Sequence, residues 1–157
     1  DNRTFGYARV SSREQHEDRQ IEALTNYGVS RDNIIVDKCS GKDTEREGYQ
    51  YLKKQILRSG DTLVIKELDR LSRSKSDIKQ ELEYFKNHGV KEISIVFDMD
   101  RIYNERVMEA IEKVKEMAAQ AGLEYIVPEW EISMGKGIDD FTLNLINQKK
   151  RRQSENF

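Results

Sequence analysis

Apolar residues follow two alternating patterns along the chain: short continuous runs, and longer segments in which they recur every three or four positions. The short runs predict β-strands at 5–10, 34–36, 62–65, 93–97 and 125–127. The longer segments predict amphipathic helices, and each is followed by a glycine that suits a helix end: Gly28, Gly60, Gly89 and Gly122. The second of these helices is expected at 44–58 and the longest at 104–121.

Strands separated by helices of this length favour right-handed crossovers and parallel pairing. We therefore expect an α/β fold, with a mainly parallel five-stranded sheet that carries helices on both faces. A further helix is expected near the end of the chain, capped by Asp139 and Asp140 and holding Phe141, Leu145 and Ile146.

The domain organisation predicted from the sequence is simple. The length of 157 residues is enough for one domain with a hydrophobic core. Because no repeat or linker interrupts the pattern, we expect a single domain over residues 1–148. A basic and polar tail is expected over residues 149–157.

Composition limits the class of protein. Hydrophobic and charged residues each make up 36% of the chain, which indicates a folded domain with a densely ionic surface. The 27 Lys and Arg against 29 Asp and Glu give a net charge of -2, so any contact with DNA must come from local patches. The single cysteine, Cys39, provides neither a disulfide framework nor a cysteine-based zinc site, and it fits a reducing cytoplasm. No apolar run approaches the roughly 18 residues of a membrane span, so no membrane contact is expected.

The first candidate for chemistry is the junction between the first strand and the first helix. The strand stops at Ser11 and Ser12 and turns directly into the helix, which places hydroxyl groups at the carboxyl edge of the sheet. Open α/β sheets usually keep their reactive groups at that edge. An alternative is structural, because Ser11 and Glu14 also fit a capping box at the helix start. The two interpretations are compatible.

A second group of polar residues follows the third strand. It supplies Asp69, Arg70 and Arg73, and a parallel sheet would bring them to the same edge as Ser11. With Arg9 and Arg46, four guanidinium groups could converge near one serine, an arrangement that suits phosphoryl transfer. The alternative is a set of surface ion pairs with the acidic residues Asp37, Glu45, Glu47 and Asp69.

Four motifs in this order resemble the catalytic domain of serine site-specific recombinases, the resolvase/invertase family. They lie in roughly the first 90 residues and are Tyr7-Ala-Arg-Val-Ser-Ser with Gln15 and Arg19-Gln20 after it, Asp37-Lys-Cys-Ser-Gly-Lys, Arg46-Glu-Gly and Leu68-Asp-Arg-Leu-Ser-Arg73. Each motif is weak alone, but the four together are very specific.

The resemblance implies that Ser11 attacks a DNA phosphodiester, leaving a covalent 5′-phosphoserine and a free 3′-hydroxyl. It implies that Arg9, Arg70 and Arg73 bind the scissile phosphate and that Arg46 acts from a mobile loop. Asp69 would handle protons or hold the arginines, and Gln20 would be a polar neighbour. No metal is implied, because arginines take its place. The implied partner is double-stranded DNA, held by a homodimer or tetramer, and His16 is taken as a surface residue.

The second half of the chain departs from this family. We find neither the long dimerisation helix nor the helix-turn-helix that members usually carry. Residues 91–148 instead resemble the second half of a toprim-like domain, found in primase-related proteins of phages and conjugative elements. The segments that carry this resemblance are Ile93-Ser-Ile-Val-Phe-Asp-Met-Asp100, the helix after it, Trp130 and Gly135-Lys-Gly-Ile-Asp-Asp140.

The toprim-like resemblance implies that Asp98 and Asp100 bind Mg²⁺ together with Glu67, since Mg²⁺ prefers oxygen ligands. Both aspartates also suit ordinary loop and helix-cap positions. Three hypotheses therefore stand: a recombinase catalytic domain over residues 1–90 with a toprim-like second half, a Mg-dependent nucleic-acid-processing domain, and an inactive accessory domain of a mobile element.

Overall fold

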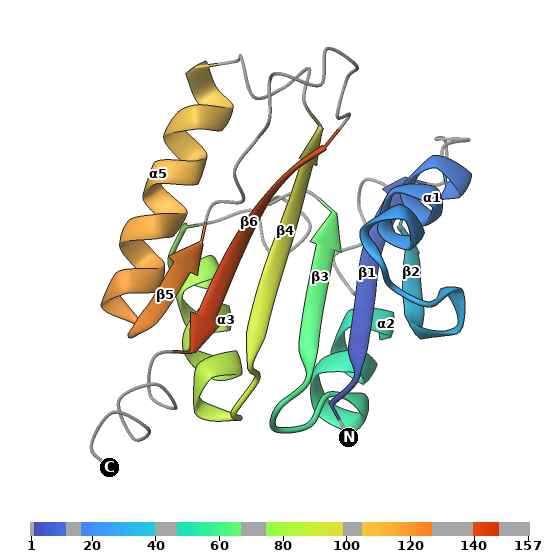
Figure 1. Cartoon of the computed structure of the whole chain (residues 1–157), viewed down its shortest axis with the longest axis horizontal. Helices are drawn as coiled ribbons and strands as arrows, with labels where there is room; N and C mark the ends of the chain where they lie inside the picture. Colours follow the sequence, from blue (N-terminus) through green and yellow to red (C-terminus); the bar gives the residue numbers. More distant parts are fainter. Residues whose placement is uncertain are drawn as a thin grey trace.

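A sheet of six strands, in the order β2-β1-β3-β4-β6-β5, runs through the part of the chain that the structure describes (Figure 1). The structure is a computed structural model, and it describes residues 2–11, 17–39, 47–66, 75–98, 105–126 and 140–147. The strands are β1 (Thr4–Ser11), β2 (Ile34–Cys39), β3 (Thr62–Lys66), β4 (Glu92–Asp98), β5 (Leu123–Ile126) and β6 (Asp140–Asn147).

Most neighbouring strands run parallel. β1 pairs in parallel with both β2 and β3, and β3 pairs in parallel with β4. β6 lies antiparallel between β4 and β5. The predicted α/β fold with a mainly parallel sheet is confirmed, but the sheet has one strand more than the five predicted.

The additional strand, β6, corrects the helix predicted after Asp140. Leu143 and Leu145 are both fully buried, and they pair with Ile95 and Ile93 of β4. Burial therefore follows the two-residue period of a strand rather than the spacing of a helix. The helix prediction is wrong because it followed the spacing of Phe141, Leu145 and Ile146 and overlooked the alternation of Phe141, Leu143 and Leu145 with polar residues, which is the period of a strand.

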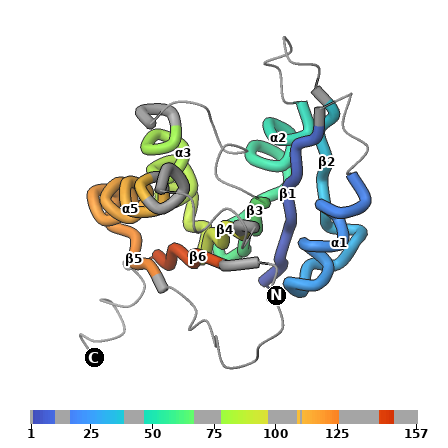
Figure 2. Tube along the Cα trace, turned by 90° about the horizontal axis from the view of Figure 1, so that it is seen from above, coloured from blue at the N-terminus to red at the C-terminus, as the bar shows by residue number. Residues whose placement is uncertain are grey.

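Helices cover both faces of the sheet, as predicted (Figure 2). They are α1 (Glu17–Tyr27), α2 (Glu47–Tyr51), α3 (Lys75–Asn87) and α5 (Glu105–Gln120), with a short 3₁₀ turn η1 (Arg31–Asn33). α2 continues as a π-helical turn, η2 (Leu52–Ile56), and the backbone is extended at Leu57, so this helix ends earlier than predicted. None of the helices in the described ranges is long and apolar enough to cross a membrane.

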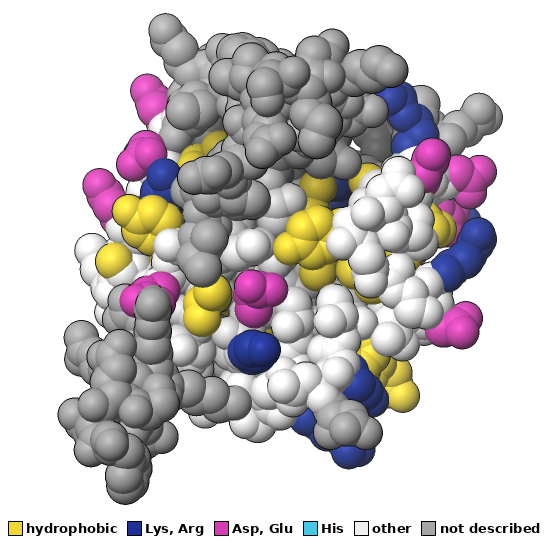
Figure 3. Space-filling model, in the orientation of Figure 1, with side chains coloured by type: hydrophobic (Ala, Val, Ile, Leu, Met, Phe, Trp, Pro, Cys, Tyr) yellow, Lys and Arg dark blue, Asp and Glu magenta, His cyan; other side chains and the backbone are white. Residues whose placement is uncertain are grey.

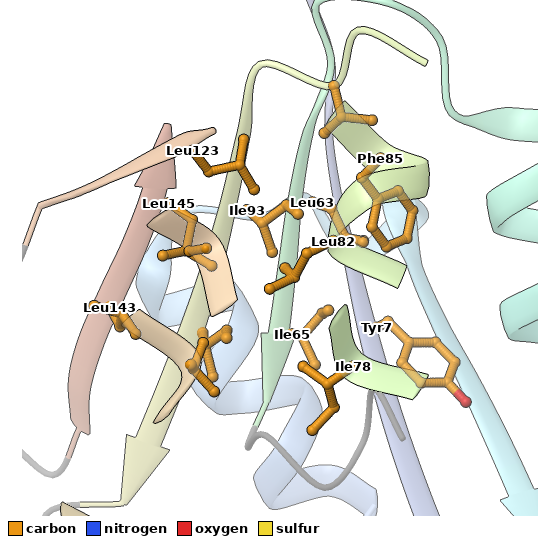
Figure 4. Packing of buried hydrophobic residues seen from close by; sticks show 14 of the residues in the cluster. Tyr7, Leu63, Ile65, Ile78, Leu82, Phe85, Ile93, Leu123, Leu143 and Leu145 are labelled. Carbon is orange, nitrogen blue, oxygen red and sulfur yellow. The ribbon is translucent and has the colours of Figure 1, made fainter. Parts of the chain in front are cut away.

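Two clusters of buried side chains hold these layers together. The larger cluster lies between the sheet and the helices α2, α3 and α5, and Figure 4 shows much of it. It includes Ile78, Leu82 and Phe85, the apolar face that the sequence predicts for α3. The smaller cluster packs α1 against the other face and consists of Ala8, Leu24, Val29, Val64 and Val96.

The parallel strands define one edge of the sheet as the place for a site. β2, β1 and β3 are adjacent, and their last residues are Cys39, Ser11 and Lys66. The chain segments 40–46, 12–16 and 67–74, which hold most of the predicted site residues, therefore leave from three neighbouring strand ends.

Candidate active site

Ser11 is the last residue of β1, and its backbone pairs with Cys39 of β2. Arg9 lies two positions earlier on the same strand, opposite Asp37 of β2, and its side chain is half-buried. One interior strand, paired on both sides, thus carries both the predicted nucleophile and one predicted phosphate ligand. Residues 12–16 lie outside the described residues, so the capping-box interpretation stays a prediction.

The remaining residues of the predicted phosphate pocket are Arg46, Asp69, Arg70 and Arg73, and all of them lie outside the described residues. The structure describes the elements to which they connect. Arg46 directly precedes α2, and the segment with Arg70 and Arg73 joins the end of β3 to the start of α3. Convergence of the arginines on Ser11 stays a prediction.

Asp37 anchors the start of α2. Its side chain is 8% exposed, and its carboxylate accepts hydrogen bonds from the Tyr7 hydroxyl at 2.7 Å, the Gly48 amide at 2.8 Å and the Tyr49 amide at 3.0 Å. The two amides belong to the first turn of α2, where the backbone donors have no partner within the helix. Asp37 therefore fixes the point at which the chain enters α2, directly after Arg46. The prediction of a surface ion pair is wrong for Asp37, because this carboxylate is buried.

Gly48 permits this close approach. A Cβ atom at position 48 would lie 2.6 Å from Oδ1 of Asp37 and 2.9 Å from Cγ2 of Ile35. Both distances are shorter than real Cβ contacts, so a side chain there would push α2 away from β2. This close approach explains why the last position of the Arg46-Glu-Gly motif is a glycine and not a larger residue. Sequence reasoning missed the anchoring role of Asp37, although the motifs contain both Asp37 and Gly48.

Gln20 lies on α1, and its exposure is intermediate. Its side-chain oxygen Oε1 is buried, and it has no hydrogen-bond partner among the described residues. A buried acceptor without a donor is costly, by about 1–3 kcal/mol, so such groups are uncommon in folded proteins. The place of Gln20 beside the pocket stays a prediction.

One ion pair of the described residues lies close to the end of β2. The ammonium of Lys38 on β2 lies 2.8 Å from the carboxylate of Glu17, the first residue of α1. The hydrogen bond and the charge of Glu17 raise the pKa of Lys38 above its usual value. On the face shown in Figure 3, acidic and basic side chains both occur on the left and right flanks, so this part of the described surface is not a uniform basic field.

The predicted magnesium site stays a prediction. Asp98 ends β4, where its backbone pairs with Asp140 of β6, whereas Glu67 and Asp100 lie outside the described residues. Within the described ranges, no three His, Cys, Asp or Glu side chains are grouped so that they could hold a metal ion.

Comparison with known proteins identifies the family. The family model described as "Resolvase, N terminal domain" matches residues 4–128, and the chain belongs to this family. The match continues past residue 90 through β4, α5 and β5, and the toprim-like resemblance finds no support among the matches.

Individual relatives agree with this assignment. The Tn3 resolvase of Escherichia coli is 44% identical over 88 residues, which is 56% of this chain and 47% of that protein. The Tn917 resolvase of Enterococcus faecalis is 40% identical over 96 residues, 61% of this chain and 50% of that protein. The chain thus spans about half the length of the curated relatives it matches. Among solved structures, the methyltransferase SibL aligns over 93% of this chain and 50% of its own, with a TM-score of 0.41 and 8% identity, too remote to bear on function.

Proposed function

We propose that this chain is the catalytic part of a serine recombinase, which cleaves and rejoins double-stranded DNA in site-specific recombination of a mobile element. The family match carries the proposal. The position of Ser11 supports it, because the residue ends β1, an interior strand that lies between β2 and β3 in the sheet. The ends of those two strands lead into the segments that hold Arg46, Arg70 and Arg73.

In the proposed reaction, the Ser11 hydroxyl oxygen attacks the phosphorus of a DNA phosphodiester. A bond forms between the serine oxygen and phosphorus, and the bond from phosphorus to the 3′-oxygen breaks. The leaving oxygen gains a proton and becomes a 3′-hydroxyl, while the DNA 5′-phosphate stays on the serine. Attack by the 3′-hydroxyl of another strand reverses these steps, so rejoining needs no nucleotide cofactor.

Arginines would supply the charge stabilisation that the reaction needs. Arg9, Arg70 and Arg73 would bind the scissile phosphate, and Arg46 would approach from the segment before α2. Guanidinium groups match phosphate oxygens in pairs and stay protonated at any physiological pH. We propose that no metal cofactor takes part. Asp69 would hold the arginines or move a proton, with Gln20 nearby.

The partners follow from the chemistry. Recombination cuts both strands of each duplex, and each cut uses one serine, so the active form would be a homodimer or tetramer on double-stranded DNA. With a net charge of -2, binding must rely on local arginines and on this assembly. We place the protein in the cytoplasm, where the DNA of a bacterial mobile element lies.

A covalent adduct tests the proposal. The full chain is incubated in chelator with a library of duplexes that have random centres and a central nick, so that cleaved strands cannot be rejoined. An adduct that resists denaturation is expected for the unsubstituted protein and for Ser12→Ala, but not for Ser11→Ala. An adduct that persists in Ser11→Ala contradicts the proposal. Activity that requires Mg²⁺ and is lost in Asp98→Ala favours the alternative, a Mg-dependent nucleic-acid-processing domain.

A further inference from the structure

A buried polar cluster joins α2 and its continuation η2 to α3. It consists of Tyr49, Lys53 and Glu81. Oε2 of Glu81 accepts a hydrogen bond from the Tyr49 hydroxyl at 2.9 Å and lies 2.8 Å from Nζ of Lys53. The side chains of Lys53 and Glu81 are only 13% and 15% exposed. One carboxylate oxygen of α3 therefore contacts two side chains, that of Tyr49 on α2 and that of Lys53 on η2.

Tyr49 extends this cluster to the sheet. Its backbone amide donates to Asp37 of β2, while its hydroxyl, at the other end of the residue, donates to Glu81 of α3. Its ring packs against the rings of Tyr7 and Phe85, with centroids 5.1 Å and 6.5 Å away. The residue is fully buried, so a movement of α2 relative to α3 would break several contacts at once.

Lys53 is held from a second side. Its ammonium lies 4.1 Å from the centre of the Tyr84 ring, and Tyr84 also belongs to α3. A desolvated cation over an aromatic face is attracted to the ring. The lysine thus contacts a carboxylate and an aromatic ring of the same helix, which leaves it little freedom of position.

Lys53 and Glu81 form a partly buried ion pair, and pairs that are largely removed from water often contribute more to geometry than to stability. Apolar side chains of similar size can replace such pairs with little change in stability, whereas the pair itself accepts only a narrow range of positions. The ring of Tyr49 packs against Phe85 of α3, and the hydrogen bond and ion pair to Glu81 add directional contacts to this apolar packing. The cluster therefore favours one alignment of the two helices.

This alignment bears on the proposed site. Arg46 comes directly before α2, and Arg73 comes shortly before α3. We propose that Tyr49, Lys53 and Glu81 are positioning residues of the recombinase site, which set the start of α2 against the start of α3 and hence the two arginine-bearing segments against each other. This inference rests on the proposed function.

The test is a double variant, Lys53→Met with Glu81→Leu, which removes both charges and keeps side-chain volume. The matched control is Lys115→Met with Glu112→Leu on α5. There Nζ of the lysine lies 3.3 Å from the glutamate and 5.1 Å from the centre of a tyrosine ring, that of Tyr125. The control pair has the same residue types and a similar aromatic neighbour, but it lies within one helix and its glutamate is 65% exposed, so it joins no two elements.

Two measurements are made on the full chain. Spin labels at the exposed positions Gln50 and Glu83, in a Cys39→Ser background, report the distance between α2 and α3. The rate of covalent adduct formation, measured with the random-centre duplexes in a single turnover, reports the site. Tm and affinity for the duplexes are recorded for every variant, because a purely structural defect would lower them together with the rate.

We expect the double variant to broaden the distance distribution and to slow adduct formation at least about tenfold at nearly unchanged Tm and affinity, as small misplacements of catalytic groups do. The control should stay within about twofold of the unsubstituted protein. Should the double variant fail to fold, Tyr49→Phe removes only the hydroxyl contact. It is expected to slow the reaction about twofold to tenfold, the equivalent of one hydrogen bond.

The outcomes separate the two proposals. An unchanged adduct rate in the folded double variant overturns the positioning role, whatever the distances show. If the double variant does not fold, an unchanged rate in Tyr49→Phe overturns it. If the unsubstituted protein forms no adduct, the proposed function fails, and the distance measurement alone decides whether the cluster aligns α2 with α3. An unchanged distance distribution then overturns that claim as well.

Discussion

Replacing Asp37 by alanine tests the structure that surrounds the proposed site. Its carboxylate accepts hydrogen bonds from the hydroxyl of Tyr7 and the amides of Gly48 and Tyr49. The bonds from Tyr7 and Tyr49 are buried, and the bond from Gly48 is partly buried. Alanine would remove the carboxylate that accepts all three of these hydrogen bonds.

The expected cost follows from these contacts. A buried donor without a partner costs about 1–3 kcal/mol, and the loss of a helix cap costs about 1 kcal/mol. Water that enters the space left by the carboxylate relieves part of this, so we expect Asp37→Ala to lower the free energy of unfolding by about 3–5 kcal/mol. For a chain of this length, Tm would fall by about 6–20 °C.

Urea denaturation followed by circular dichroism measures this loss. Asp32→Ala is the matched control, because Asp32 is exposed, and it should change the free energy of unfolding by less than about 0.5 kcal/mol. Tyr7→Phe removes one donor and leaves the carboxylate its two amide partners, so a loss of about 1 kcal/mol is expected. A loss below about 1 kcal/mol for Asp37→Ala would refute the anchoring role of this carboxylate.

Three further predictions concern the site and the fold. Arg70→Ala and Arg73→Ala should each slow adduct formation at least about a hundredfold, as the loss of a charge-stabilising donor does, and near-normal rates in either would contradict the phosphate pocket. Gly48→Ala should lower the free energy of unfolding by about 1–3 kcal/mol, because its Cβ would meet a carboxylate oxygen, and an unchanged urea midpoint would count against this contact. Burial raises the pKa of Tyr27 above 10.0, so folding favours its protonated form. The stability that this shift provides is present below pH 10 and is lost as pH rises through the folded-state pKa. Tyr27→Phe should therefore flatten the alkaline fall in Tm, and an identical fall in both proteins would contradict the shift.

The elements that the sequence predicted well are those whose own periodicity decides their burial. In α3, Ile78, Leu82 and Phe85 lie on one side at helical spacing, and all three are buried against the sheet. β3 and β4 are continuous apolar runs, as strands with both faces covered require. For such elements, the spacing of apolar residues within the segment is enough to predict whether it is a helix or a strand.

Features that depend on a distant segment could not be predicted in this way. β6 carries the alternation of a strand, with Leu143 and Leu145 separated by the polar Asn144, but the segment is short, and its pairing with β4 is visible only in the fold. The same holds for Glu81, which looks like one of many surface charges on an amphipathic helix. Only the fold reveals that it faces Tyr49 and Lys53.

The fold also bears on the predicted change of character near residue 90. Residues from both sides of that point share one hydrophobic cluster, including Leu63 before it and Leu143 after it. The hydroxyl of Tyr27 on α1 donates to Asn144 of β6, a hydrogen bond between residues 117 positions apart. A boundary at residue 90 therefore does not separate two cores.

A shared core links the second half of the chain to the strand that carries Ser11. β1 pairs with β3, β3 pairs with β4, and β4 pairs with β6. Loss of packing at β6 would thus weaken a sheet in which Ser11 and Arg9 hold fixed positions. The residues after 90 therefore belong to the same sheet and core as the strand that carries Ser11, even where they contribute no group to the proposed chemistry.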